Sequence, residues 1–214
     1  MPVDSPALCR LVVHGRHAGL LPGALLACAA PLQPWLEQSM ALHMGMEIPL
    51  LFVLGWFAAR TAGPPLGRLL APCNALGIPG LAFALLATSL WMIPAALDYA
   101  VASPAVGTAK AASLVAAGLL AGASWPRAGL VVQAFFVLNG FWMTFVAGLL
   151  YRAAPQQLCS VYLPEEQALA GAAMMAWAAA GLAAWTPSVL RQLRQWNSEE
   201  EWSREEEWGQ PEGD

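Results

Sequence analysis

Long apolar runs recur along the whole chain, separated by short stretches that contain proline, glycine or charged residues. A helix that crosses a bilayer needs about 20 consecutive, mostly apolar residues. Six runs reach or approach this length, at residues 18–33, 39–59, 75–97, 107–124, 128–151 and 166–190. The first is the shortest, because Pro22 and Pro31 bracket its apolar part. The pattern predicts an all-α fold, a polytopic membrane bundle of about six transmembrane helices.

The composition agrees with this interpretation. The chain is 58% hydrophobic and only 11% charged, whereas a soluble domain usually has about 25% charged residues. Its wealth of Ala, Leu and Gly, without long alternation of polar and apolar positions, favours helices over a lipid-embedded barrel. Small residues suit the close approach of membrane helices, and examples are Gly118, Gly122, Gly171 and Gly181. No basic cluster is interleaved with aromatic residues, so we expect no nucleic-acid partner.

The basic residues predict an orientation, since Lys and Arg in short loops favour the cytoplasmic side. With six helices, one side of the membrane carries Arg10, Arg16, Arg60, Arg68, Arg127, Arg191, Arg194 and Arg204. The other side carries only Lys110 and Arg152. Both termini are therefore expected in the cytoplasm. Residues 1–190 form the predicted bundle, and the acidic residues of 191–214 predict a disordered cytoplasmic tail.

The segment from Met40 to Glu47 contains the most chemically informative residues. Positions three and four apart share one helix face, so Met40, His43, Met44 and Glu47 form one stripe. Ionisable side chains inside a membrane segment are costly, and they indicate function by default. The seven methionines after Met1 all fall in the outer half of the predicted bundle.

Thioether and imidazole ligands together select soft metals such as copper(I). We therefore expect a copper(I) site, with a set of ligands that comprises His43, Met44, Met46, Met40, Met92, Met143 and either Met174 or Met175. Three polar residues are expected to support these ligands, namely Glu47, Asp98 and Asn139.

Other interpretations of the same residues remain open. Methionine fills gaps in cores without any metal, and His43 could be a hydrogen-bonded packing residue. A hydrolase could use His43 and Glu47 for acid–base work on a lipid or small substrate, although one histidine is too few for the usual catalytic zinc site. A small-solute transporter could use Glu47 and Asn139 to line a path. We expect a protein without catalytic turnover. The four cysteines form no C-x-x-C pair, and we expect them to be buried apolar residues.

Three motifs occur in a suggestive order. The first is His43-Met44-Gly45-Met46-Glu47, followed by Pro49. The second is Trp91-Met92-Ile93-Pro94, which precedes Asp98. The third combines Glu166-Gln167, Gly171 and Met175-Ala176-Trp177. Over residues 24–185 the chain resembles the multi-helix CtaG family of cytochrome c oxidase assembly factors.

The resemblance implies a multi-pass protein of the bacterial inner membrane, a copper chaperone for oxidase assembly. Its implied partners are a haem–copper oxidase subunit or a periplasmic copper chaperone, in addition to the bilayer. The chain departs from the family where Glu47 replaces the second histidine of a His-Met-x-x-His motif. Met92 replaces the histidine of a Trp-His-x-Pro turn, and Asn139 stands where another histidine is expected. These departures leave open a softer copper site, a different ligand, or loss of the metal.

Overall fold

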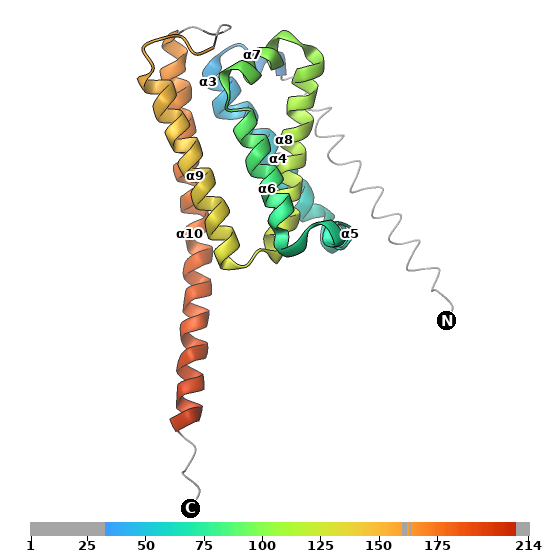
Figure 1. Cartoon of the computed structure of the whole chain (residues 1–214), viewed down its shortest axis with the longest axis vertical. Helices are drawn as coiled ribbons and strands as arrows, with labels where there is room; N and C mark the ends of the chain where they lie inside the picture. The colour runs from blue at the N-terminus through green and yellow to red at the C-terminus, as the bar shows by residue number, and fades with distance from the viewer. Residues whose placement is uncertain (1–32, 160–161, 163, 209–214) are drawn as a thin grey trace, which may run out of the picture.

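The computed structural model describes residues 33–159, 162 and 164–208, and this part of the chain is almost entirely helical (Figure 1). Except for Gln33, the predicted helix at 18–33 lies outside the described residues. The short elements are α2 (Gln33–Leu36), α5 (Pro64–Leu70), η2 (Ala71–Cys73), η3 (Ala75–Gly77) and η4 (Trp125–Arg127). The bundle itself is built from the remaining elements, in which α3 and η1 lead directly into α4. They are α3 (Met40–Leu42), η1 (His43–Glu47), α4 (Ile48–Ala62), α6 (Ile78–Leu90), α7 (Pro94–Ala102), α8 (Pro104–Ser124), α9 (Leu130–Ala153) and α10 (Pro164–Trp208).

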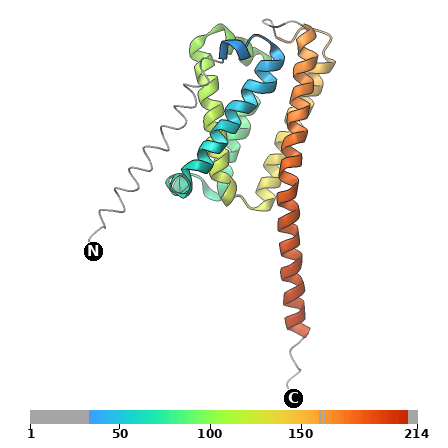
Figure 2. The same ribbon diagram turned by 180° about the vertical axis from the view of Figure 1, so that it is seen from behind.

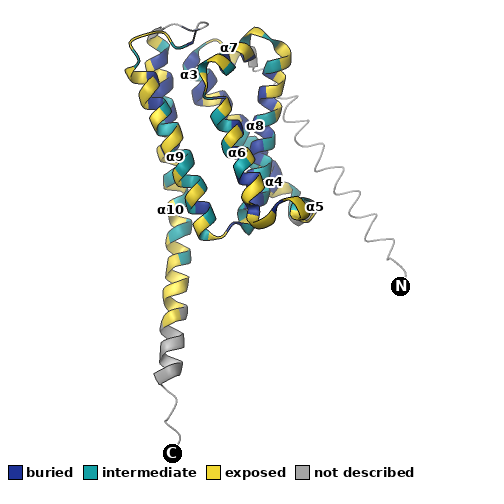
Figure 3. Ribbon diagram, viewed as in Figure 1, coloured by how far each residue is buried: buried dark blue, intermediate teal, exposed yellow. Residues whose placement is uncertain are grey.

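Four helices of the described part are long and apolar enough to cross a membrane. They span Met40–Ala62, Pro104–Arg127, Leu130–Ala153 and Glu165–Ser198. A bent pair, Ala75–Leu90 with Pro94–Ala102, adds a fifth if it counts as one span. The large apolar side chains of α9 are widely exposed, for example Val131, Phe135 and Trp142 (Figure 3). An exposed apolar surface of this kind suits contact with lipid. The described residues confirm an all-α fold with candidate membrane spans, whereas the count of six helices stays a prediction.

The helices form two groups that lie next to each other (Figures 1 and 2). Helices α4, α6 and α8 pack together, and α9 and α10 form an antiparallel pair beside them. A Cβ atom at Gly118 would strike the backbone of Phe52, which shows how closely α8 approaches α4. Gly148 and Gly171 meet in the same way between α9 and α10. The expectation for small residues is confirmed at Gly118, Gly122 and Gly171, whereas a Cβ atom at Gly181 would meet no other atom within 4 Å.

The predicted continuous helix at 75–97 is broken in the structure. Helix α6 ends at Leu90 and α7 begins at Pro94, and their axes differ by 78°. Ile93 has an extended backbone, with φ −78° and ψ 125°. A residue before proline avoids the α conformation, and proline suits the first turn of a new helix. The sequence Ile93-Pro94 therefore starts a new helix here.

Helix α10 also differs from the prediction, because it continues to Trp208. Residues 191–208 are helical where a disordered tail was expected. The stretch between Ser188 and Trp208 contains no glycine or proline and is rich in Glu, Gln and Arg, which are good helix formers. Its side chains from Arg191 to Ser198 are mostly exposed, and the helix extends well beyond the bundle (Figures 1 and 3).

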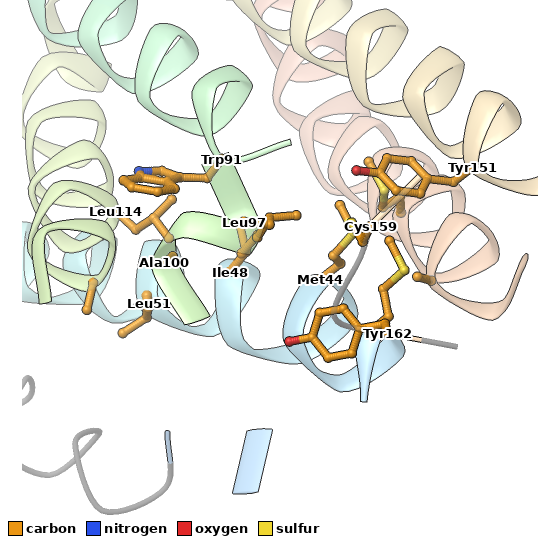
Figure 4. Close-up of a cluster of buried hydrophobic side chains, with 14 of the residues drawn as sticks. Met44, Ile48, Leu51, Trp91, Leu97, Ala100, Leu114, Tyr151, Cys159 and Tyr162 are labelled. Atoms are coloured by element: carbon orange, nitrogen blue, oxygen red, sulfur yellow. The ribbon is translucent and has the colours of Figure 1, made fainter. Parts of the chain in front are cut away.

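The main apolar core lies near the end of the bundle where α3 and α7 are found (Figure 1). In the close-up of this core, Met44, Cys159 and Tyr162 are at one end, and Trp91 and Leu114 are at the other (Figure 4). Two residues of the polar segment predicted from sequence, Met40 and Met44, therefore belong to this core.

Candidate functional site

The segment from His43 to Glu47 forms a π turn, η1, between α3 and α4. Such wide turns are rare and are frequent at functional sites. The predicted stripe is confirmed by burial: Met40, His43, Met44 and Glu47 are between 0% and 4% exposed. Met46, off this stripe, is 50% exposed. The π turn thus directs its imidazole and carboxylate into the protein.

Helix α10 holds the π turn in place. Nε1 of Trp177 donates a hydrogen bond of 2.5 Å to the carbonyl oxygen of Gly45. Oε2 of Glu166 accepts one of 2.9 Å from the backbone N–H of Met40. A Cβ atom at Gly45 would press against Ala173, so the turn and α10 approach closely. Residues of the third motif therefore contact the first motif directly.

Lys110 in α8 is at the centre of a polar cluster that also contains Glu37, His43, Glu47 and Tyr162. Its side chain is 0% exposed. Its Nζ lies 2.9 Å from Oε1 of Glu37 and 2.8 Å from Oε1 of Glu47. It also lies 2.9 Å from Nε2 of His43. An ammonium group has three N–H donors, so these three contacts use all of them.

The contacts of Lys110 fix the tautomer of His43. Because the ammonium cannot accept a hydrogen bond, Nε2 of a neutral imidazole is the acceptor and the proton is on Nδ1. The Nδ1–H group then donates to the hydroxyl oxygen of Tyr162, at 2.7 Å. Both ring nitrogens of His43 are therefore engaged with protein groups.

Glu47 retains one oxygen without a hydrogen bond. Its Oε2 is buried and has no partner of this kind among the residues that the structure describes, although it lies 3.6 Å from Nε2 of His43. One ligand atom from each of Glu37, His43 and Glu47 lies within 4.8 Å of the others, a spacing that could hold a metal ion. The cluster combines carboxylate and imidazole, the donors of zinc and similar divalent metals.

The connection between α9 and α10 brings Tyr162 to this cluster. Gln167 is buried and donates to the carbonyl of Tyr151, while it accepts from the backbone N–H of Leu158. Burial, and then the charges of Glu37 and Glu47, raise the pKa of the Tyr162 hydroxyl above its ordinary value. The hydroxyl consequently stays protonated beside His43.

Cys159, in the same connection, is 1% exposed. Burial, assisted by the negative charge of Asp98, raises the pKa of its thiol to about 11. The expectation of buried cysteines is therefore confirmed here, but Cys73 is exposed. Cys9 and Cys28 lie outside the described residues.

Three methionines meet at a separate cavity of about 50 Å³. Met44 comes from the π turn, Met92 from the break between α6 and α7, and Met174 from α10. The rest of the lining is Ile48, Pro49, Thr144 and Trp177. Thr144 contacts the sulfur of Met92, with Oγ1 at 3.9 Å from Sδ. The fold thus gathers thioethers from three separate segments, while His43 is absent from the residues that line this cavity.

The other predicted ligands have different surroundings. Met40 is buried in the apolar core. Met143 is 41% exposed, near the hydroxyl of Ser89. Met175 is half-buried, and its sulfur lies 4.0 Å from Nη1 of Arg152. The structure therefore divides the predicted layer of methionine and histidine among the thioether cavity, the polar cluster, the apolar core (Met40) and half-buried or exposed positions (Met175, Met46 and Met143).

The two remaining polar candidates do not contact His43 in the described part of the chain. Asp98 is half-buried in α7, where its charge acts on Cys159. Asn139 is half-buried near the middle of α9. Of the three supporting residues expected, only Glu47 lies beside the imidazole.

Sequence reasoning did not identify Lys110, Glu37 and Tyr162 as site residues. A signal was present for one of them, because Lys110 is the only lysine of the chain and lies within a run of small apolar residues. A lone charge inside such a helix requires a buried partner. No comparable signal marks Glu37 or Tyr162.

No protein-family model, curated protein or solved structure matches this chain.

Proposed function

We propose that this membrane protein binds copper(I) and helps to assemble a cytochrome c oxidase or a similar cuproenzyme. The observation that carries the proposal is the cavity lined by Met44, Met92 and Met174. Thioethers are soft ligands that favour copper(I) over hard divalent ions. Three of them around one small cavity form a donor set suited to a soft monovalent cation.

The surroundings of the cavity suit the same ion. Ile48, Pro49 and Trp177 supply apolar walls, and Thr144 contacts the sulfur of Met92. Apolar walls limit the access of water, and the partner of a ligand atom restricts its orientation. Copper(I) bound there would be cargo that is held in its reduced state and passed on.

The position of the cavity suits the proposed delivery of copper(I) on the periplasmic side of the membrane. It lies at the end of the bundle that contains the π turn and the α6–α7 break, away from the extension of α10 (Figure 1). Under the proposed orientation, with both termini cytoplasmic, this end faces the periplasm. Service to a haem–copper oxidase follows from the resemblance to the CtaG family, which supplies this part of the proposal.

Copper(I) titration of the purified full chain tests the proposal. Under reducing conditions, with a chromophoric chelator as competitor, we expect one copper(I) per chain. The variant Met44→Leu/Met92→Leu/Met174→Leu should lose it. Such volume-conserving changes usually cost less than about 1.5 kcal/mol each, so the fold should survive.

A matched control uses methionines outside the cavity. Met46→Leu/Met143→Leu changes two exposed thioethers and should leave copper binding unaltered. Equal loss in both variants, or no copper bound by the native chain, would contradict the cavity as the site. Transfer of bound copper to a copper-free haem–copper oxidase, with recovery of oxygen reduction, tests the assembly role.

The alternative functions give different results in the same preparation. An intramembrane hydrolase would show lipid turnover that Glu47→Gln abolishes without any metal. A small-solute transporter would show uptake in proteoliposomes that does not depend on the three methionines.

A further inference from the structure

We infer that Lys110 occupies a divalent-metal site built from Glu37, His43 and Glu47, and that its ammonium keeps divalent metals out of the protein's polar core. The inference concerns a different set of residues from the methionine cavity and does not depend on copper binding.

The geometry places two cations in competition for one position. Ligand atoms of Glu37, His43 and Glu47 lie within 4.8 Å of one another, and Nζ of Lys110 lies 2.8–2.9 Å from all three residues. Zinc would lie about 2.0–2.2 Å from nitrogen and oxygen ligands of this type. The ammonium and a metal ion therefore cannot be present together.

An independent observation is that the ammonium of Lys110 does not contact every potential ligand atom of the cluster. Its three N–H groups serve Glu37 Oε1, Glu47 Oε1 and His43 Nε2. Within the described part of the chain, Oε2 of Glu47 remains buried without a hydrogen bond. A metal bound by both oxygens of Glu47 would satisfy this atom, which an ammonium with three donors does not reach.

The role of Lys110 follows from charge. Glu47 is buried within a candidate membrane span and Glu37, which is half-buried, lies just before it, so the two carboxylates require a nearby cation. Lys110, as a residue of α8, supplies this cation permanently, so the charge balance of the cluster does not depend on a bound metal ion. Imidazole and carboxylate ligands otherwise suit zinc and related divalent ions. Lys110 thus determines which metals the protein excludes.

Zinc binding to the full chain tests the inference. The native protein should show no change in melting temperature with zinc. Lys110→Ala should melt at a lower temperature without metal, and one equivalent of zinc should raise this temperature, because binding to the folded state stabilises it. Equilibrium dialysis should show one more zinc per chain in Lys110→Ala than in the native protein.

The double variant Lys110→Ala/Glu47→Gln is the matched control. It keeps the space left by the lysine but removes one ligand charge, so both the extra zinc and the rise in melting temperature should disappear. If Lys110→Ala is recovered folded only when zinc is present during purification, the inference is supported. It is overturned if zinc neither binds nor rescues Lys110→Ala, or if the native chain binds one zinc that Glu47→Gln removes.

Discussion

Nζ of Lys110 in α8 lies 2.8 Å from Oε1 of Glu47 in the π turn, and both side chains are almost fully buried. This ion pair joins the candidate membrane spans Met40–Ala62 and Pro104–Arg127 near one end of the bundle. Its two charges depend on each other, because neither has bulk water as an alternative partner.

Removal of Lys110 should therefore destabilise the protein strongly. Breaking a buried ion pair by deleting one partner costs about 3–5 kcal/mol, because a charge is left uncompensated. Lys110→Met should lower the free energy of unfolding in detergent by this amount. Lys110→Met/Glu47→Gln should cost less than the sum of the single changes, with a coupling of roughly 0.5–3 kcal/mol. Additive losses would show that the pair does not act as a unit, and Arg191→Met on exposed α10 is the control.

The hydrogen bond between His43 and Tyr162 gives a second prediction. Tyr162→Phe leaves the Nδ1–H group of His43 buried without its acceptor, which should cost about 1–3 kcal/mol. Tyr99→Phe is the matched control, because Tyr99 is 70% exposed. Thermal unfolding of the two variants measures the difference. Equal melting temperatures would mean that the Tyr162 hydroxyl contributes nothing to stability.

Cys159 should be protected from alkylation. Its thiol is buried and its pKa is raised to about 11, whereas Cys73 is exposed. In a Cys9→Ser/Cys28→Ser background, a maleimide at pH 8 should label Cys73 within minutes and leave Cys159 largely unlabelled. The thiolate is the reactive form, so labelling of Cys159 should accelerate about tenfold per pH unit up to about pH 11.

The same thiol links stability to alkaline pH. The pKa of the thiol is 9.0 without the protein environment and about 11 in the folded chain, so the folded state retains the proton longer. This contribution is complete below pH 9 and is lost as the pH rises toward 11. Native protein should lose stability over this interval faster than Cys159→Ala. A Cys159→Ala variant with the same alkaline slope would refute the assignment.

Two glycines provide a paired test of helix packing. Gly118→Ala places a methyl group against the backbone of Phe52, and such overpacking typically costs about 1–3 kcal/mol. Gly181→Ala has open space around it and should be neutral or stabilising by roughly 0.5–1 kcal/mol, since Ala favours helix. Unfolding free energies of the two variants should therefore differ in sign or clearly in size. Similar values would show that α4 and α8 are less tightly packed than described.

Local physics predicted much of the fold from the sequence. Apolar length identified the long helices, because a run of that kind has few other ways to satisfy its backbone in lipid. The i, i+3 and i+4 spacing correctly predicted the buried stripe of Met40, His43, Met44 and Glu47. The conformational preference of a residue before proline indicates the break at Ile93-Pro94. The apolar length of residues 75–97 instead predicted one continuous helix.

The site was less predictable, because its members come from segments that are distant in sequence. Glu37, His43, Lys110 and Tyr162 meet only after α8 and the α9–α10 connection have packed against the π turn. Periodicity places a residue on a face but does not say which face of another helix it meets. Lys110 was assigned to the membrane surface for this reason, as a basic residue near a helix end. The convergence of Met44, Met92 and Met174 likewise depends on the bend between α6 and α7.

The π turn from His43 to Glu47 contains one more residue than an α-helical path would need. An α-helix advances by about 100° per residue, but the wide turn takes up the extra residue within a single turn, so α4 faces its neighbours nearly as in an uninterrupted helix one residue shorter. Deletion of Gly45 would therefore restore a regular helix and leave the side chains of α4 facing the same neighbours. Only the residues of the turn, among them His43 and Glu47, would change their mutual positions. The additional backbone unit thus shapes the polar site and leaves the rest of the span in phase.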